Sequence, residues 1–287
     1  MQVTGDQGVG ESTLAFNHHA MNTWWQVRVS GEEAIYAAQA AQAAFVITDR
    51  MESLMSRFRD DSEITAISGL PTGGRHHLSK EVYDCLSLAL ETQAMTGGAF
   101  DVCALMGSPL KMSPRWGLDA SVHDLIVNEA PCRMDLGAIA KGFTLDRMAE
   151  ELKVWGIDRF LLMSSGSSIL AGEPPVGASG WAVRLGDTEG VGGVSLSRMA
   201  VGTSGFEMKG AHIVDPATGR ASTRYERSWA FAPLAAEADA LSTSWMNMEW
   251  GAIRKYCEER DAGACVVDRA MGILQAGLSG LLKTNPA

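Results

Sequence analysis

Two residues late in the chain have the types and spacing of a metal site. Asp239 and Thr243 lie four positions apart in the segment ADALST, so on a helix their side chains share one face. A carboxylate and a hydroxyl are hard oxygen donors, which suit Mg²⁺, an ion that keeps several waters and also takes substrate phosphates. The structural alternative is a helix N-terminus at which Asp239 is a capping acid, and the segment alone favours neither interpretation.

A second segment, MDLGAIAKGF, has the features of an anion site. A predicted strand ends, Gly137 and Gly142 flank the start of a helix, and Lys141 falls in its first turn. Free backbone N–H groups at a helix start attract anions, the lysine adds a positive charge, and glycine lets a phosphate approach the backbone. Taken alone, the segment is better explained as a tight strand-to-helix turn with a surface lysine.

Two further segments carry polar residues at turns. His212 precedes the turn sequence Asp-Pro-Ala-Thr-Gly, and a histidine at a strand end can relay protons near neutral pH. The alternative is a histidine whose hydrogen bonds are satisfied by that turn. The run TGGAFD, from Thr96 to Asp101, is typical of a helix C-terminus followed by a turn.

Other patterns limit the classes of function. The sequence has no Walker A run and no GxGxxG after a predicted strand, and the serines of GTSG and SSGSS do not fit the GxSxG elbow. A net charge of −10 argues against nucleic acid as a partner, because phosphate binding needs a basic footprint. Five cysteines without a CxxC pair indicate buried reduced thiols, not a disulfide framework or a zinc site.

Helices and strands alternate along the chain, and they must position these residues. Helices are predicted over residues 32–56, 79–96, 139–154 and 237–259, the last with a break at Gly251, and strands over 24–29, 133–136, 160–163, 181–185 and 264–267. Residues 101–131 are expected to be irregular. The apolar side of the helices is expected to include Ala34, Ala38, Ala41, Phe45, Val82, Leu86, Ala89, Phe143, Met148 and Leu152. This arrangement predicts one compact α+β unit.

Taken in order, these segments resemble the FAD:protein FMN transferase (ApbE-like) family. The similarity is carried by TGGAFD, MDLGAIAKGFTLD, HIVDPATG and ADALST, with weaker agreement at FNHHAMNT, MSRFRDDSE and GTSGFE. Each motif is weak alone, but seven in order over about residues 16–275 are specific. The resemblance implies an α+β, bilobal single unit of the T-fold-like type, with mixed or antiparallel sheets and packed helices.

The resemblance also implies a reaction. Enzymes of this family use Mg²⁺ to split the pyrophosphate of FAD, move FMN to a Ser or Thr hydroxyl of a partner protein, and release AMP. The implied partners are therefore FAD and an acceptor protein with a Ser/Thr flavinylation motif, with no nucleic acid. Two alternatives stay open: a FAD-binding protein without turnover, and a FAD pyrophosphatase that gives FMN and AMP.

The family motifs assign roles to individual residues of this chain. Mg²⁺ would be held by Asp239, Thr243, the carbonyl of Ser242 and a carbonyl at Gly137–Ala138. Lys141 would lie near the pyrophosphate, and His212 would relay protons. The FAD-binding residues implied by the resemblance are Met21, Phe58, Asp101, Gly137, Ala138, Lys141, Ser165, Gly166 and His212.

The sequence also departs from the family pattern. Met-Gly-Thr of the family is Met21-Asn22-Thr23 here, and Gly-Gly-Asp is Ser165-Gly166-Ser167. These changes predict an altered substrate fit, and they favour the binding-only alternative. The intact Asp239 and Lys141 favour turnover.

Two predictions concern the ends of the chain and its location. Residues 1–13 are Gly-rich and polar and are expected to be flexible, and residues 14–287 are expected to form a single flavin transferase domain. No membrane span and no export signal are predicted. A cytoplasmic location is expected for the chain as given, or a periplasmic one if a leader was removed.

Overall fold

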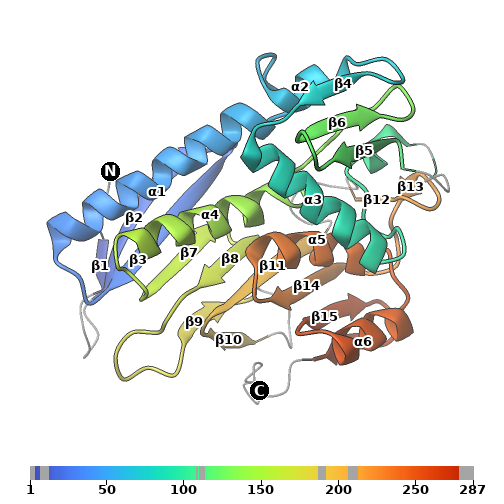
Figure 1. Cartoon of the computed structure of the whole chain (residues 1–287). Coiled ribbons are helices and arrows are strands. Elements are labelled where there is room, and N and C mark those ends of the chain that lie inside the picture. Colours follow the sequence, from blue (N-terminus) through green and yellow to red (C-terminus); the bar gives the residue numbers. More distant parts are fainter. Residues whose placement is uncertain are drawn as a thin grey trace.

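A nine-stranded antiparallel sheet forms the centre of the molecule (Figure 1). The computed structural model describes residues 4–6, 13–107, 109, 114–186, 192–205 and 213–277. The strand order is β1-β2-β3-β7-β8-β11-β14-β15-β16. The strands are β1 (Thr4–Asp6), β2 (Thr13–Ala20), β3 (Thr23–Ser30), β7 (Phe160–Ser164), β8 (Ser168–Ala171), β11 (Met199–Gly205), β14 (Arg227–Ala232), β15 (Gly263–Asp268) and β16 (Gly272–Ala276).

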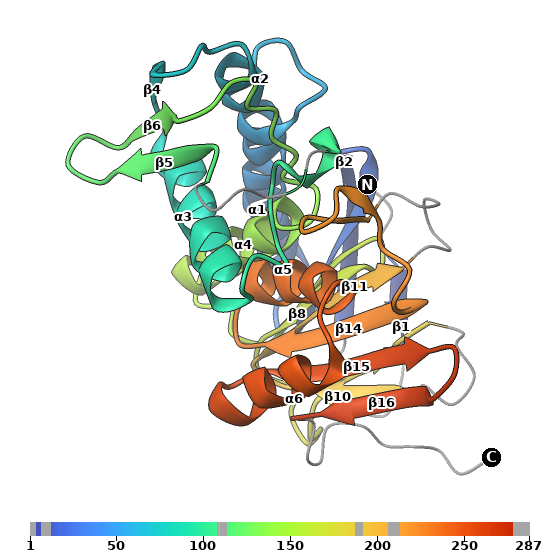
Figure 2. The same ribbon diagram turned by 90° about the vertical axis from the view of Figure 1, so that its right-hand side faces the viewer.

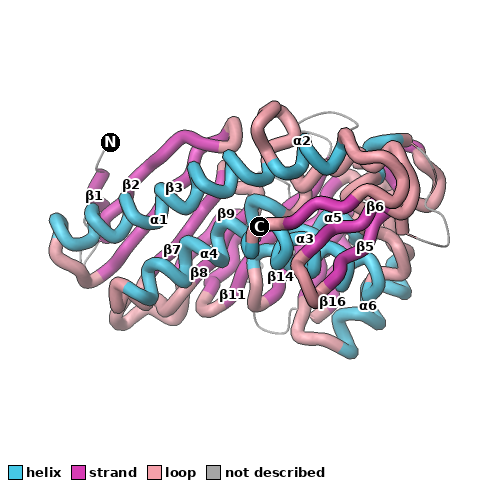
Figure 3. Tube along the Cα trace, turned by 45° about the horizontal axis from the view of Figure 1, so that its top comes forward, coloured by secondary structure: helices cyan, strands magenta, loops and turns pink. Residues whose placement is uncertain are grey.

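Three helices cover one face of this sheet: α1 (Ala34–Met55), α4 (Ala140–Val154) and α5 (Ala235–Trp245). Figure 3 shows α1 and α4 alongside each other, over the end of the sheet that contains β2 and β3. Helix α1 begins where the Glu33 carboxylate accepts hydrogen bonds from the amides of Ile35 and Tyr36. Its bounds confirm the predicted helix.

The predicted apolar face of α1 is partly wrong. Ala34 is exposed and Ala38 is half-buried, and the core is formed by Ala37, Ala40, Ala41, Ala44 and Phe45. The segment is so rich in alanine that more than one face of the helix is apolar in the sequence. The packing of α1 against α4 and β2 determines which of these faces is buried.

Glycines let the backbones of α4, α5 and β11 approach closely. A Cβ added at Gly142 of α4 would lie 2.0 Å from the carbonyl oxygen of Ala235, and one added at Gly202 of β11 would lie 2.2 Å from that of Ala238. Helix α5 therefore lies in contact with both α4 and the sheet, as Figure 2 shows for α5 over β11 and β14.

A two-stranded hairpin covers the opposite face of the main sheet. It consists of β9 (Trp181–Arg184) and β10 (Gly193–Leu196). Trp181 and Val183 of β9 pack in one buried cluster with Trp229 and Phe231 of β14. The central strands of the main sheet, such as β8 and β14, are thus buried on both faces.

A smaller lobe lies at one end of the helical layer (Figure 1). Its sheet has the order β4-β6-β5, with β4 (Arg75–His77), β5 (Trp116–Asp119) and β6 (Asp124–Val127). Helices α2 (Glu63–Ser68) and α3 (Lys80–Met95) pack with it, and Ser79 caps α3 as expected, by accepting from the amide of Val82. The short 3₁₀ helix η1 (Ala104–Met106) follows α3.

Two predictions about this region are wrong. Residues 101–131 were expected to be irregular, but they contain the β5–β6 hairpin. Residues 133–136 were expected to form a strand, but they do not, and the amide of Asp135 donates a single hydrogen bond to the carbonyl of Val102 at 2.8 Å. A β-strand needs a series of such hydrogen bonds to a neighbouring strand, and the apolar sequence pattern alone does not provide them.

The end of the chain also differs from the prediction. The expected helix over 237–259 is two helices, α5 and α6 (Trp250–Glu259), and they are separated at residues 246–249, not at Gly251. The hairpin β12 (Val214–Asp215) and β13 (Arg220–Ala221) precedes β14. At the other end of the chain, Thr4–Asp6 pair antiparallel with Thr13–Ala15. The flexibility expected for residues 1–13 stays a prediction.

The cysteines have the state that the sequence predicted. All five cysteines are free and buried. Within the described ranges, no helix is long and apolar enough to cross a membrane.

Candidate functional site

The carboxylate of Asp239 lies where α4, α5 and β8 meet. Its Oδ2 accepts a hydrogen bond from the amide of Gly142 at 2.7 Å, and its Oδ1 accepts one from Ser168 Oγ at 2.6 Å. Asp239 is 4% exposed. Burial raises the pKa of Asp239 to about 6, against the positive charge of Lys141 and these two hydrogen bonds, which lower it. A carboxyl group held in this way is not a simple exposed cap.

Thr243 lies one helical turn beyond Asp239, beside another hydroxyl. Its Oγ1 is 3.0 Å from Ser204 Oγ of β11, which is also 2.9 Å from Ser242 Oγ. The carbonyl of Ser242, which the resemblance offered as a metal ligand, accepts a hydrogen bond from Ser228 Oγ of β14 at 2.5 Å. The hydroxyls of Thr243 and Ser204 are therefore in contact one helical turn beyond Asp239, whereas the carbonyl of Ser242 accepts from β14.

An amide in the first turn of α4 donates to Asp239. In an α-helix the amide of residue i donates to the carbonyl of residue i−4. The amide of Gly142 donates to Asp239 Oδ2 and not to the carbonyl of Ala138, which lies two residues before the first residue of α4. Gly137 turns the chain just before this point, and its amide donates to Asp135 Oδ1 at 2.8 Å.

Lys141 contacts a hydroxyl of the β7–β8 turn. Lys141 Nζ donates to Ser167 Oγ, and the Ser165 hydroxyl contacts Thr23 Oγ1. Ser165 and Gly166 both have left-handed backbones, with φ of 43° and 69°. Lys141 of α4 is thus in contact with Ser167 of this turn, and Ser165 of the turn is in contact with Thr23.

The three remaining FAD candidates lie on loops. Met21 and Asn22 form the β2–β3 turn with φ of 52° and 53°, so asparagine adopts the left-handed conformation that the family's glycine would favour. Phe58 is 81% exposed, and the guanidinium of Arg57 lies 4.2 Å from its ring centre. Asp101 accepts from the amide of Cys103 at 2.9 Å, and burial raises its pKa.

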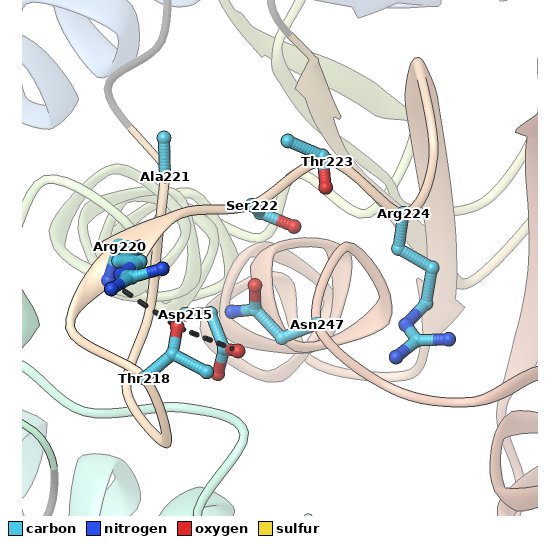
Figure 4. Close-up of a pocket in the computed structure, with 8 residues that line it drawn as sticks. All are labelled: Asp215, Thr218, Arg220, Ala221, Ser222, Thr223, Arg224 and Asn247. Carbon is cyan, nitrogen blue, oxygen red and sulfur yellow. Dashed lines mark hydrogen bonds between the residues drawn. The ribbon is translucent and has the colours of Figure 1, made fainter.

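His212 lies outside the described residues, but the turn that follows it lines a pocket. This cavity of about 620 Å³ is bounded by the β12–β13 hairpin, the segment after it and Asn247, which lies four residues beyond Thr243 (Figure 4). Asn247 Nδ2 donates to the carbonyls of Ala99 and Val214, at 3.1 and 3.4 Å. The motifs TGGAFD and HIVDPATG are therefore joined at the end of α5.

The donor set at Asp239 fits a hard divalent cation that keeps open positions. Within the described part of the chain, no three His, Cys, Asp or Glu residues cluster as metal ligands. One carboxylate, the Thr243 hydroxyl and the Ala138 carbonyl would leave room for waters and for substrate phosphates, as is typical of Mg²⁺. A zinc or transition-metal site would need more nitrogen or sulfur donors.

Comparison with known proteins identifies the fold family. A model of the ApbE family matches residues 21–267. The chain belongs to the ApbE family. It is 28% identical over 279 residues to the FAD:protein FMN transferase of Treponema pallidum, covering 78% of this chain and 75% of the relative. It is 24% identical over 266 residues to that of Escherichia coli K12, covering 79% and 76%.

Solved structures agree with this assignment. The flavin transferase ApbE of Vibrio cholerae superposes with a TM-score of 0.81 over 94% of this chain and 99% of its own, at 16% identity. The ApbE protein of Thermotoga maritima gives 0.81 over 99% and 100%, at 21% identity. The expected α+β single-unit fold of an ApbE protein is thereby confirmed.

The sequence analysis missed the partners of Asp239 and Thr243. Ser168 and Gly142 donate to the two oxygens of Asp239, and Ser204 contacts Thr243. Ser168 and Ser204 lay inside the quoted runs SSGSS and GTSG, and Gly142 was noted as a glycine at a helix start, but none of the three was assigned a partner. Contacts between β8, β11, α4 and α5 join residues about 40 to 100 positions apart, which local patterns do not reveal.

Proposed function

We propose that this protein is a Mg²⁺-dependent FAD:protein FMN transferase, which moves FMN from FAD to a Ser or Thr hydroxyl of an acceptor protein and releases AMP. The observation that supports this most is the buried carboxylate of Asp239, which accepts hydrogen bonds from the amide of Gly142 in the first turn of α4 and from Ser168 Oγ, with Thr243 one helical turn away. Both curated relatives described above are named FAD:protein FMN transferase.

Asp239, Thr243 and the carbonyl of Ala138 would hold the cation. When bound, Mg²⁺ would neutralise charge on the pyrophosphate oxygens of FAD. The Ser242 carbonyl, held by Ser228, contributes less to this set. Ser204 and Ser168 orient the Thr243 hydroxyl and the Asp239 carboxylate, as hydrogen-bonded neighbours of metal ligands generally do.

The residues around Lys141 would bind the nucleotide. Lys141, held against Ser167, would place its charge beside the phosphates, and His212 would relay the proton of the acceptor hydroxyl. Phe58 presents an exposed ring that can stack on the isoalloxazine. The surface that binds FAD would also include Met21, Asp101, Gly137, Ser165 and Gly166.

One experiment separates the three activities compatible with this site. The protein is incubated with FAD, Mg²⁺ and an acceptor protein that carries a Ser/Thr flavinylation motif, and AMP release and in-gel flavin fluorescence of the acceptor are measured. The proposal predicts both signals, and their loss in Asp239→Ala. AMP without a fluorescent acceptor indicates a pyrophosphatase, and tight FAD binding without AMP indicates a binding protein.

His212 needs its own test, because it lies outside the described residues. His212→Ala should lower the rate of FMN transfer more than it weakens FAD binding, since a proton relay acts in the transition state. Equal losses in turnover and in FAD affinity would contradict a relay role. FAD affinity is measured by fluorescence titration without acceptor, and turnover by single-turnover AMP release.

A further inference from the structure

Two of the five cysteines are in contact, although they are 29 positions apart in the sequence. Cys103 Sγ lies 4.0 Å from Cys132 Sγ, and the residues are 3% and 0% exposed. Both belong to the core of the smaller lobe, with Phe100, Trp116 and Met134 among their buried neighbours. The odd number of cysteines in the sequence gave no indication of this pair.

The backbones around the two sulfurs are already held side by side. Cys103 follows the TGGAFD motif, and its amide donates to Asp101 Oδ1 at 2.9 Å. Cys132 precedes the MDLGA turn, and Asp135 of that turn donates to the carbonyl of Val102 at 2.8 Å. The two thiols therefore link two motif-bearing segments that a hydrogen bond independently joins.

We propose that Cys103 and Cys132 are a modification site, at which a reversible disulfide forms by exchange with a low-molecular-weight disulfide such as oxidised glutathione. A disulfide has a sulfur–sulfur length of about 2.05 Å, so from the present contact each sulfur moves about 1 Å, within reach of side-chain rotation. The inference does not depend on the proposed function.

The exchange occurs in two balanced steps. When local opening of the smaller lobe exposes the buried pair, the Cys132 thiolate attacks one sulfur of glutathione disulfide, whose S–S bond breaks and releases one glutathione. The Cys103 sulfur then attacks the Cys132 sulfur, and the second glutathione leaves. Two protein thiols are oxidised by two electrons, and the small disulfide is reduced to two thiols that take up the two protons.

The electrostatics of the pair select Cys132 as the attacking sulfur. The hydrogen bond from Cys103 lowers the pKa of the Cys132 thiol, and the charge of Arg115 lowers it further. The hydrogen bond with Cys132 and burial raise the pKa of Cys103. By contrast, burial raises the pKa of Cys257 to about 11 and that of Cys265 to about 12, and it raises that of Cys85 as well. The thiolate is the reactive form, so exchange should begin at this pair.

The test uses the folded, full-length protein. It is incubated with oxidised glutathione, then denatured and alkylated without reductant, and analysed by intact mass and peptide mapping. We expect three alkylated cysteines of the five and one cross-linked peptide pair that contains Cys103 and Cys132. The Tm should rise by about 5–10 °C, because the bond closes a loop in the unfolded chain, and should return when dithiothreitol is added.

Two variants provide the comparison. Cys257→Ala, in a different core cluster, should keep the cross-link and the Tm rise, whereas Cys132→Ala should lose both. Five alkylated cysteines, a stable glutathione adduct without a cross-link, or a cross-link to any other cysteine would overturn the proposal. The mass measurement is made on the unaltered protein, so it decides the question even if Cys132→Ala fails to fold.

Discussion

At the scale of single residues, the hydroxyl of Thr243 distinguishes a metal site from a capped helix. Thr243→Val keeps the shape of the side chain and removes the oxygen. We expect the Mg²⁺ concentration for half-maximal AMP release to rise about 10–100-fold, which is typical for the loss of a ligand or of its hydrogen-bonded neighbour. The measurement is AMP release from FAD across a magnesium titration.

Ser244→Ala is the matched control for this prediction. Ser244 is the next residue of α5, and its hydroxyl donates to the carbonyl of Ala240 at 2.8 Å within the helix. Its removal should leave the magnesium dependence unchanged. If Thr243→Val and Ser244→Ala give the same titration curve, the Thr243 hydroxyl does not bind the ion.

At the same scale, the sequence showed which residues could form a site more readily than it showed which residues they contact. Asp239, Thr243 and Lys141 were singled out because their spacing places them on helix faces and helix starts. Ser204 and Ser168 were not, because nothing local to GTSG or SSGSS shows which helix lies above their strands. His212 stays a prediction.

At the scale of elements, Asp146 of α4 holds the start of α5. Its two carboxylate oxygens accept from the amides of Ala235 and Ala236, at 2.8 and 2.9 Å. Helix α5 has no capping side chain of its own at Leu234, so its free N–H groups are satisfied by another helix. The position of Asp239 on α5 therefore depends on α4.

Asp146 predicts a specific pH dependence of stability. Burial raises its pKa to about 6 in the folded protein, above the ordinary value of 3.8 for an aspartate. The folded state binds more protons between these values, so this contribution to the free energy of unfolding is fully present below about pH 4 and is lost as the pH rises through about 6. The loss is about 3 kcal/mol.

Asp146→Asn isolates this effect, because asparagine does not titrate. The free energy of unfolding is measured by urea denaturation from pH 4 to pH 7 for both proteins. The wild type should lose stability relative to the variant over this range. Parallel curves would show that the pKa of Asp146 is not raised.

Glycine contacts make a second prediction at the scale of elements. Gly202→Ala would place a Cβ 2.2 Å from the Ala238 carbonyl oxygen, so β11 and α5 must separate. We expect a loss of about 2 kcal/mol or more in the free energy of unfolding, as for other overpacked cores. The control is Gly251→Ala in α6, where no atom lies within 4 Å and helix propensity predicts a gain of up to about 1 kcal/mol. Chemical denaturation compares the two variants, and equal effects would contradict the close packing.

Helices were predicted well because their signals are local. The capping serine of α3, Ser79, and the apolar periodicity of α3 and α4 can each be recognised from residues within the segment itself. The β5–β6 hairpin was missed because each strand has only four residues, and its turn lacks the Asn-Gly or Asp-Gly signal. The split between α5 and α6 fell at residues 246–249, where Ser222 bonds the Met246 carbonyl, a contact 24 positions away.

At the scale of the whole molecule, the proposed FAD site draws residues from both lobes. Phe58 and Asp101 come from segments that flank the smaller sheet, whereas Lys141 and Asp239 lie over the main sheet. FAD with Mg²⁺ should therefore slow amide hydrogen exchange both at residues 97–103 and at residues 137–142. Protection confined to one of these segments would contradict a site shared by the two lobes.

The most direct test of the central claim is a crystal of the protein grown with FAD and Mn²⁺, which replaces Mg²⁺ and gives an anomalous signal. The account predicts one anomalous peak within about 2.5 Å of an Asp239 carboxylate oxygen and the Thr243 hydroxyl, and in contact with the pyrophosphate of FAD. A peak elsewhere, or FAD bound with its pyrophosphate away from α5, would contradict it.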